Sequence, residues 1–116
     1  MLILDSSSQV SGESNFNILK QFVSDLVSNY VVGDSGARIA LISFSDTATG
    51  QWTLLDHTTV GDLQQAVNSL RYENGLSNIA AGLQLARQTT FTVANGDRSN
   101  VPNIAVLIAA STANVR

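Results

Sequence analysis

The sequence predicts a doubly wound α/β fold, in which helices cover both faces of a mostly parallel sheet. Three short apolar runs, at residues 1–5, 38–45 and 104–110, lack the alternation of a half-exposed strand. Such runs are typical of parallel strands that are buried on both faces. Stretches with apolar residues at helical spacing lie between them, and strands that alternate with helices favour this architecture. A length of 116 residues fits a single domain, 1–116.

The first predicted helix spans residues 15–31. Apolar side chains recur there every three or four residues, which gives a helix one wide apolar face. Ser14 and Asn15 offer N-cap chemistry. A glycine, either Gly33 or Gly36, is expected to end the helix.

A short strand is expected at residues 51–55. It follows the second apolar run too closely for a crossover helix, which indicates an antiparallel edge strand. Two more helices are predicted, over 63–70 after a capping sequence at 59–62, and over 77–86. This order of elements leads us to expect the strand order 3-2-1-4, with the first strand in the centre of the sheet.

Composition excludes several classes of function. The net charge is −3 and no two of the six basic residues are adjacent, so nucleic acid is not expected as a partner. The absence of cysteine rules out disulfides and thiolate metal sites. No apolar run approaches the roughly 20 residues that span a bilayer, so no membrane insertion is expected. The opening residues reach Asp5 too soon for a signal peptide, and a secreted protein would carry its signal upstream.

The first apolar run ends in Asp5, and three serines follow it, Ser6 to Ser8. The carboxyl ends of strands are where open α/β sheets bind ligands. Serine catalysis would need an adjacent base, and His57, the only histidine, is predicted to lie beyond the edge strand. A haloacid-dehalogenase-type phosphatase would need a second aspartate where Ser7 stands, and dinucleotide binding would need a Gly-x-Gly-x-x-Gly loop. The chain is therefore not expected to be an enzyme.

Several segments, taken in order, together resemble a von Willebrand factor type A domain, also called an integrin I-like domain. The pattern that follows Asn95 is similar to the A domains of animal extracellular matrix proteins, especially the collagen-associated ones. The resemblance implies a Rossmann-like fold and a non-enzymatic adhesion or protein-interaction module, extracellular and with matrix or adhesion proteins as ligands. An intracellular scaffold domain in a multiprotein complex is the alternative. The segments are 2–8, 15–16, 42–46, 70–75, 77–86 and 101–108.

The family resemblance also implies a metal-ion-dependent adhesion site. Its loop is Asp-x-Ser-x-Ser, and Asp5 and Ser7 match the first two positions. Ser77 stands where the family has threonine. Gln9 falls on the second serine, although the loop is one residue longer than usual and Ser8 could shift into that place.

The resemblance places a second aspartate after the last strand, and Ala110 stands there. Mg²⁺ prefers oxygen ligands, with one or two carboxylates. We therefore expect a degenerate site that binds Mg²⁺ weakly or binds no metal, and ligand engagement without divalent cation. Asp46 is either a substitute carboxylate or an ordinary turn residue. Trp52 is either a binding anchor or part of the edge packing.

Family members carry two further strands and their helices after the strand that this chain has at 104–110. The chain is therefore expected to hold the N-terminal and central part of the fold, truncated before the last strands. An apolar edge strand is a template for pairing with another chain. Self-association through the 104–110 edge is the expected consequence, unless another chain covers that edge.

Overall fold

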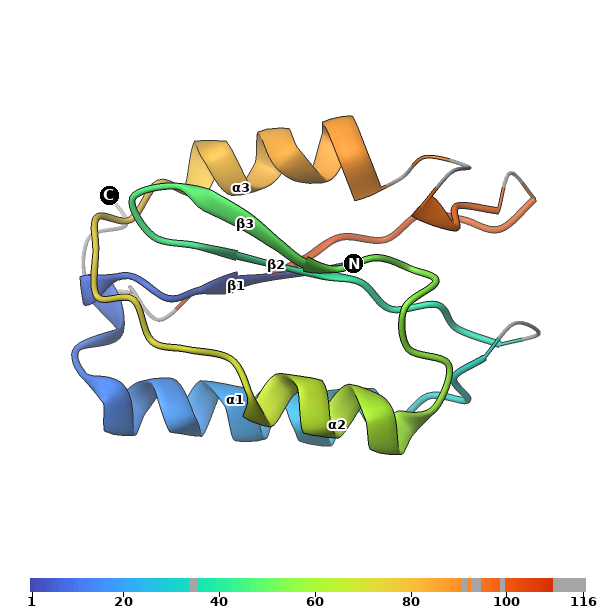
Figure 1. Cartoon of the computed structure of the whole chain (residues 1–116), viewed down its shortest axis with the longest axis horizontal. Helices are drawn as coiled ribbons and strands as arrows, with labels where there is room; N and C mark the ends of the chain where they lie inside the picture. Colours follow the sequence, from blue (N-terminus) through green and yellow to red (C-terminus); the bar gives the residue numbers. More distant parts are fainter. Residues whose placement is uncertain (34–35, 91, 93–94, 99, 110–116) are drawn as a thin grey trace.

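A central sheet separates two helical layers in a computed structural model, which describes residues 1–33, 36–90, 92, 95–98 and 100–109. Helices α1 and α2 cover one face of the sheet and α3 covers the other (Figure 1). Helices on both faces confirm the doubly wound architecture. The main elements are β1 (Leu2–Asp5), α1 (Glu13–Val27), β2 (Leu41–Phe44), β3 (Ala48–Trp52), α2 (Val60–Asn68), α3 (Ile79–Leu85) and β4 (Val106–Ile108).

The strand order is β3-β2-β1-β4, as the sequence predicts. β1 pairs in parallel with both neighbours, so that Leu2 is opposite Leu41 on one side and Val106 on the other. β3 is antiparallel to β2 and forms one edge. The carboxyl ends of β1 and β2 therefore meet at one end of the sheet, on the left in Figure 1.

The predicted position of the antiparallel strand, 51–55, is wrong by three residues. The turn after β2 is tight, because Ser45 N–H donates to Thr47 O at 2.9 Å, and β3 begins directly after it at Ala48. Its end is fixed by Asp56, whose Oδ2 accepts from Thr53 N at 2.8 Å and turns the chain away. Trp52 is buried and its Nε1 donates to Ile39 O at 3.1 Å, so edge packing, and not ligand binding, is its role.

The side chains of β1 alternate between two cores. Leu2 and Leu4 pack with Phe16 of α1 and with buried residues of α2, while Ile3 packs with Phe44 on the α3 side. Strands buried on both faces explain why the apolar run shows no alternation.

The first helix begins and ends earlier than predicted. Its N-cap is Gly12, which has no capping side chain, and not Ser14 or Asn15. It ends at Val27, because the next turn tightens: Asn29 and Tyr30 donate to carbonyls three residues back, at 3.2 Å each. The glycines at 33 and 36 belong to the turn that leads into β2.

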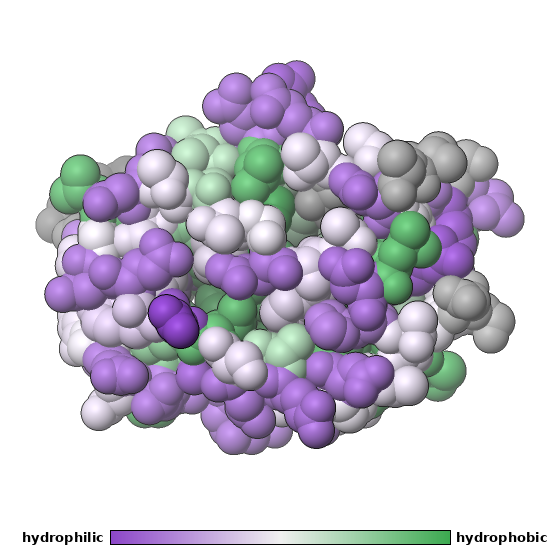
Figure 2. Space-filling model, in the orientation of Figure 1, coloured by the Kyte–Doolittle hydropathy of each residue, from purple (hydrophilic) through white to green (hydrophobic). Residues whose placement is uncertain are grey.

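The other helix starts agree with the sequence. Thr59 Oγ1 accepts from Asp62 N at 3.2 Å at the start of α2, and Asn78 Oδ1 accepts from Ala81 N at 3.1 Å at the start of α3. α3 continues into a π-helical turn, Ala86–Thr90, which extends past the predicted end of this helix at residue 86. The side of the molecule where α1 and α2 lie, at the bottom of Figure 2, is mostly hydrophilic in that view, which is consistent with amphipathic helices.

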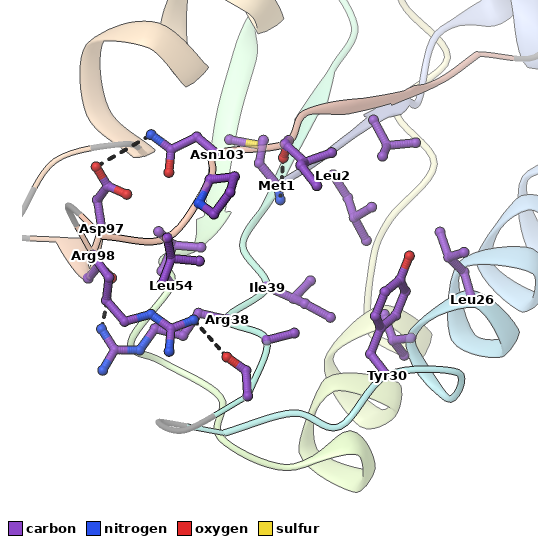
Figure 3. Close-up of a pocket in the computed structure, with 18 of the residues that line it drawn as sticks. Met1, Leu2, Leu26, Tyr30, Arg38, Ile39, Leu54, Asp97, Arg98 and Asn103 are labelled. Carbon is purple, nitrogen blue, oxygen red and sulfur yellow. Dashed lines mark hydrogen bonds between the residues drawn. The ribbon is translucent and has the colours of Figure 1, made fainter.

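The last strand is shorter than the predicted 104–110 and lies at the sheet edge. Val106 and Leu107 are 39% and 44% exposed, and only Ile108 is buried. An apolar groove of about 380 Å³ runs beside this strand, between it and α1 (Figure 3). Self-association through this edge stays a prediction. The groove is lined in part by Met1, Leu2, Phe22, Leu26, Tyr30, Leu54, Val101 and Ile104.

Candidate functional site

The serine loop after β1 is buried and held by its own hydrogen bonds. Asp5, Ser6 and Ser7 are all 0% exposed. Ser7 N–H donates to Asp5 Oδ1 at 2.8 Å, which places the two residues that match the family's loop side by side. Ser6 N–H donates to Phe44 O at 2.9 Å, so the loop is fixed to the end of the neighbouring strand.

The serine loop continues in a short 3-10 turn, Ser8–Val10. Ser7 caps the turn, its Oγ accepting from Gln9 N at 3.3 Å. Ser11 ends it in the left-handed conformation with φ 67°, where a residue other than glycine is uncommon. Ser8 and Gln9 are consequently exposed, whereas Asp5 and Ser7 are not.

A second loop, residues 70–78, brings Ser77 to the same end of the sheet. Ser6 Oγ donates to Arg71 O at 3.0 Å and accepts from Glu73 N at 2.8 Å. Ser8 N–H donates to Gly75 O at 2.7 Å, and Ser7 and Gly75 form a parallel bridge. Ser77 follows two residues later and is half-buried. The structure therefore brings the Ser77 loop directly against the loop of Asp5 and Ser7.

The place where these two loops meet, here called the corner, offers oxygen atoms that suit a hard cation. Oδ2 of Asp5 is buried and has no hydrogen-bond partner in the described part of the chain. A buried, unpaired carboxylate oxygen is costly, and a cation or its bound water would satisfy it. One carboxylate beside serine hydroxyls is oxygen chemistry of the kind that Mg²⁺ accepts. The chemistry of Asp5 and Ser7, with the Ser77 loop against them, therefore fits such an ion.

The described residues show no other group of metal ligands, and they place His57 away from the serine loop. Among residues 1–33, 36–90, 92, 95–98 and 100–109, no three His, Cys, Asp or Glu side chains group as metal ligands. His57 packs edge-on against Trp52, 5.3 Å between ring centroids. Trp52 pairs with Leu41 at the start of β2, so His57 lies at the opposite end of the sheet from Ser6–Ser8 and cannot act as their base. Ala110 lies outside the described residues.

Tyr72 is a structural member of this corner that sequence reasoning does not single out. Its hydroxyl accepts from Gly12 N at 3.2 Å and donates to Asn74 Oδ1 at 2.9 Å, and its ring lies 5.6 Å from that of Phe16. The hydroxyl thus accepts the hydrogen bond of the N-cap residue's own N–H, from 60 residues away in sequence. No local pattern in the sequence indicates this contact, because the expected N-cap is Ser14 or Asn15 and not Gly12.

Comparison with known proteins gives a family for the chain. Residues 1–115 match the family model described as von Willebrand factor type A domain. Mouse vitrin (Mus musculus) is 31% identical over 106 residues, which covers 91% of this chain and 16% of vitrin. The collagen alpha-1(XII) chain of Notophthalmus viridescens is 30% identical over 108 residues, 93% of this chain and 12% of that protein. The chain thus spans less than a fifth of these two relatives.

A solved structure shows the same fold. Proximal thread matrix protein 1 from the mussel byssus, with a zinc-occupied MIDAS motif, superposes with a TM-score of 0.83 at 27% identity. The match covers 91% of this chain and 26% of that one. The strand order and the helical layers described above are therefore those of solved members of the fold.

Proposed function

The chain belongs to the von Willebrand factor type A family, and on that premise we propose that it is a non-enzymatic protein-interaction module of an extracellular matrix or adhesion protein. The observation that carries the proposal is the corner at the carboxyl ends of β1 and β2. There Asp5, Ser7 and the loop of Ser77 are held together by hydrogen bonds at the place where the family resemblance implies an adhesion site.

The relatives favour an extracellular role over the intracellular scaffold alternative. They include a collagen chain and a mussel thread matrix protein. Protein ligands of the matrix are the corresponding partners for this chain. None of the described helices has the length and apolar character needed to cross a membrane.

The metal site is proposed to be degenerate. Asp5, Ser7 and Ser77 would hold Mg²⁺, with Ser8 or Gln9 adding an oxygen, and a bound ion would supply a Lewis-acidic position for a partner's carboxylate. Alanine at position 110 in place of the family's aspartate removes an acceptor that orients the ion's shell. Outer-shell partners of this kind are worth roughly 10- to 100-fold in affinity. Mg²⁺ binding is therefore weak, and ligand engagement does not require it.

Surface plasmon resonance against purified fibrillar collagen, fibronectin and laminin, in EDTA and in Mg²⁺, tests the interaction module. We expect binding to at least one of these matrix proteins that is the same in both buffers. Leu76, which is 74% exposed beside Ser77, offers an apolar contact at this corner, so Leu76→Ala is expected to weaken binding by about fivefold or more.

The matched control is Ile18→Ala, because Ile18 is similarly exposed, at 66%, but lies on α1. We expect this variant to bind as the wild type does. Binding to none of the three proteins, or equal losses in the two variants, would contradict the proposed function or its surface. Loss of binding in EDTA alone would contradict only the independence from cation.

A further inference from the structure

Asp46 follows β2 and holds both ends of the segment that contains Ser77. Its Oδ1 accepts from Leu76 N–H at 2.6 Å, and its main-chain oxygen accepts from Asn78 Nδ2 at 3.2 Å. Leu76 and Asn78 are the two neighbours of Ser77. The bond from Leu76 goes to a charged acceptor, and charge-assisted hydrogen bonds are shorter and roughly twice as strong as neutral ones.

Ser45 extends this attachment into the core. It is 2% exposed, its Oγ accepts from Gly75 N at 2.7 Å, and its main-chain oxygen accepts from Asn78 N at 3.0 Å. On the other side, Gly75 O accepts from Ser8 N. Residues 75–78 are therefore hydrogen-bonded to the end of β2 on one side and to the serine loop on the other.

The close approach depends on glycine at position 75. A Cβ there would lie 2.7 Å from Asp46 Oδ1, which is closer than real Cβ contacts come. The main chain of the loop thus reaches the Asp46 carboxylate only because Gly75 lacks a side chain.

We propose that Asp46 is a positioning residue for the Ser77 side of the metal corner, and not the substitute second carboxylate. Its carboxylate is already used by Leu76 N–H, which fixes the backbone directly before Ser77, and its main-chain oxygen holds the side chain of Asn78 directly after it. This inference rests on the proposed function, since it assigns a role toward the ion that Asp5, Ser7 and Ser77 would hold. A positioning acceptor needs an oxygen at this place but no charge, whereas a ligand that replaces the lost aspartate needs its charge.

The pair Asp46→Asn and Asp46→Ala separates the two roles. Asparagine keeps a carbonyl oxygen that can accept from Leu76 N–H and removes the charge, while alanine removes both. The measurement is an amide-resolved NMR titration with Mn²⁺, whose paramagnetic broadening detects even weak binding. In the wild type and in Asp46→Asn we expect broadening at Asp5, Ser7 and Ser77. In Asp46→Ala we expect the broadening to persist at Ser7 and to fall severalfold at Ser77.

Hydrogen exchange of the Leu76 amide gives a readout that needs no metal. We expect slow exchange in the wild type, at most a few-fold faster exchange in Asp46→Asn, and exchange at least about tenfold faster in Asp46→Ala. Asp56→Ala is the control, because it removes a turn carboxylate that accepts from Thr53 N at the other end of the sheet. It should change neither readout at Leu76 and Ser77.

Loss of Mn²⁺ broadening at Ser7 and Ser77 in both Asp46 variants would overturn the proposal and make Asp46 a ligand. Unchanged exchange at Leu76 in Asp46→Ala would overturn it as well. If the wild type showed no broadening at any Mn²⁺ concentration, the metal role of this corner, and with it the proposal, would be wrong. The interaction module itself would stand, because its test is carried out in EDTA.

Discussion

The two ends of the sheet are built in opposite ways. At the carboxyl end, Ser6, Ser45 and Gly75 tie segments far apart in sequence through short hydrogen bonds. At the amino end and along β4, exposed apolar side chains surround a groove of about 380 Å³ (Figure 3). Phe22 and Tyr30, both 53% exposed, belong to that second region.

The two ends differ in how far their buried polar groups and their apolar side chains are satisfied within the domain. The buried hydroxyls of Ser6, Ser7 and Ser45 at the carboxyl end have hydrogen-bond partners, whereas buried Oδ2 of Asp5 has none within the described residues. Several apolar side chains beside β4, in contrast, are exposed. Exposed apolar patches of this kind mark surfaces that contact something else. A ligand corner that is already ordered loses little entropy on binding, which fits the function proposed for it.

The largest expected contrast is between two phenylalanines of α1. Phe16 is 1% exposed and contacts Tyr72, while Phe22 faces the groove and is 53% exposed. Phe16→Ala should lower the free energy of unfolding by about 3–5 kcal/mol, and Phe22→Ala by less than about 1 kcal/mol. Urea unfolding of both variants measures this. Equal losses would mean that the groove side is as tightly packed as the carboxyl end.

A smaller effect is expected at Gly75. Gly75→Ala forces a Cβ against Asp46 and should destabilise the domain by about 1–3 kcal/mol. Gly61→Ala is the control, since Gly61 lies in α2 with nothing within 4 Å of its Cβ position. That variant should gain roughly 0.5–1 kcal/mol from helix propensity. The midpoint temperature of thermal unfolding should therefore fall in Gly75→Ala and rise in Gly61→Ala. A Gly75→Ala protein as stable as the wild type would show that the loop is looser than described.

The smallest effect concerns the hydroxyl of Tyr72. Tyr72→Phe keeps the ring beside Phe16 but leaves Gly12 N–H without its acceptor, and should cost about 0.5–1.5 kcal/mol. Tyr30→Phe removes the hydroxyl of a ring that is half exposed in the groove, and should change stability by no more than about 0.5 kcal/mol. Chemical unfolding of Tyr72→Phe and Tyr30→Phe measures whether the hydrogen bond from Gly12 N–H to the Tyr72 hydroxyl stabilises the start of α1.

Some elements of the structure could be predicted from the sequence and others could not. The first strand that ends in Asp5, the caps at Thr59 and Asn78, and the strand order depend on local patterns and chain order, and these predictions are confirmed. The end of α1 and the limits of β3 were mispredicted. They depend on turns whose main-chain bonds, such as those of Tyr30 and Ser45, leave little trace in the sequence.

The candidate site also has one part that could be predicted from the sequence and one part that could not. Asp5 and Ser7 are two residues apart in sequence and their contact could be predicted. The placement of Ser77 depends on Asp46 and Ser45, about 30 residues away. No periodicity or spacing encodes that attachment, and the presence of Gly75 is its only local sign.

Calorimetric titration with Mn²⁺ of the wild type, Asp5→Ala and Ala110→Asp tests most directly whether the metal corner is degenerate. We expect weak binding at most in the wild type, none in Asp5→Ala, and affinity raised by roughly 10- to 100-fold in Ala110→Asp. Tight binding by the wild type that disappears in Asp5→Ala and does not improve in Ala110→Asp would contradict this, and would show that one carboxylate and the serine hydroxyls complete the site.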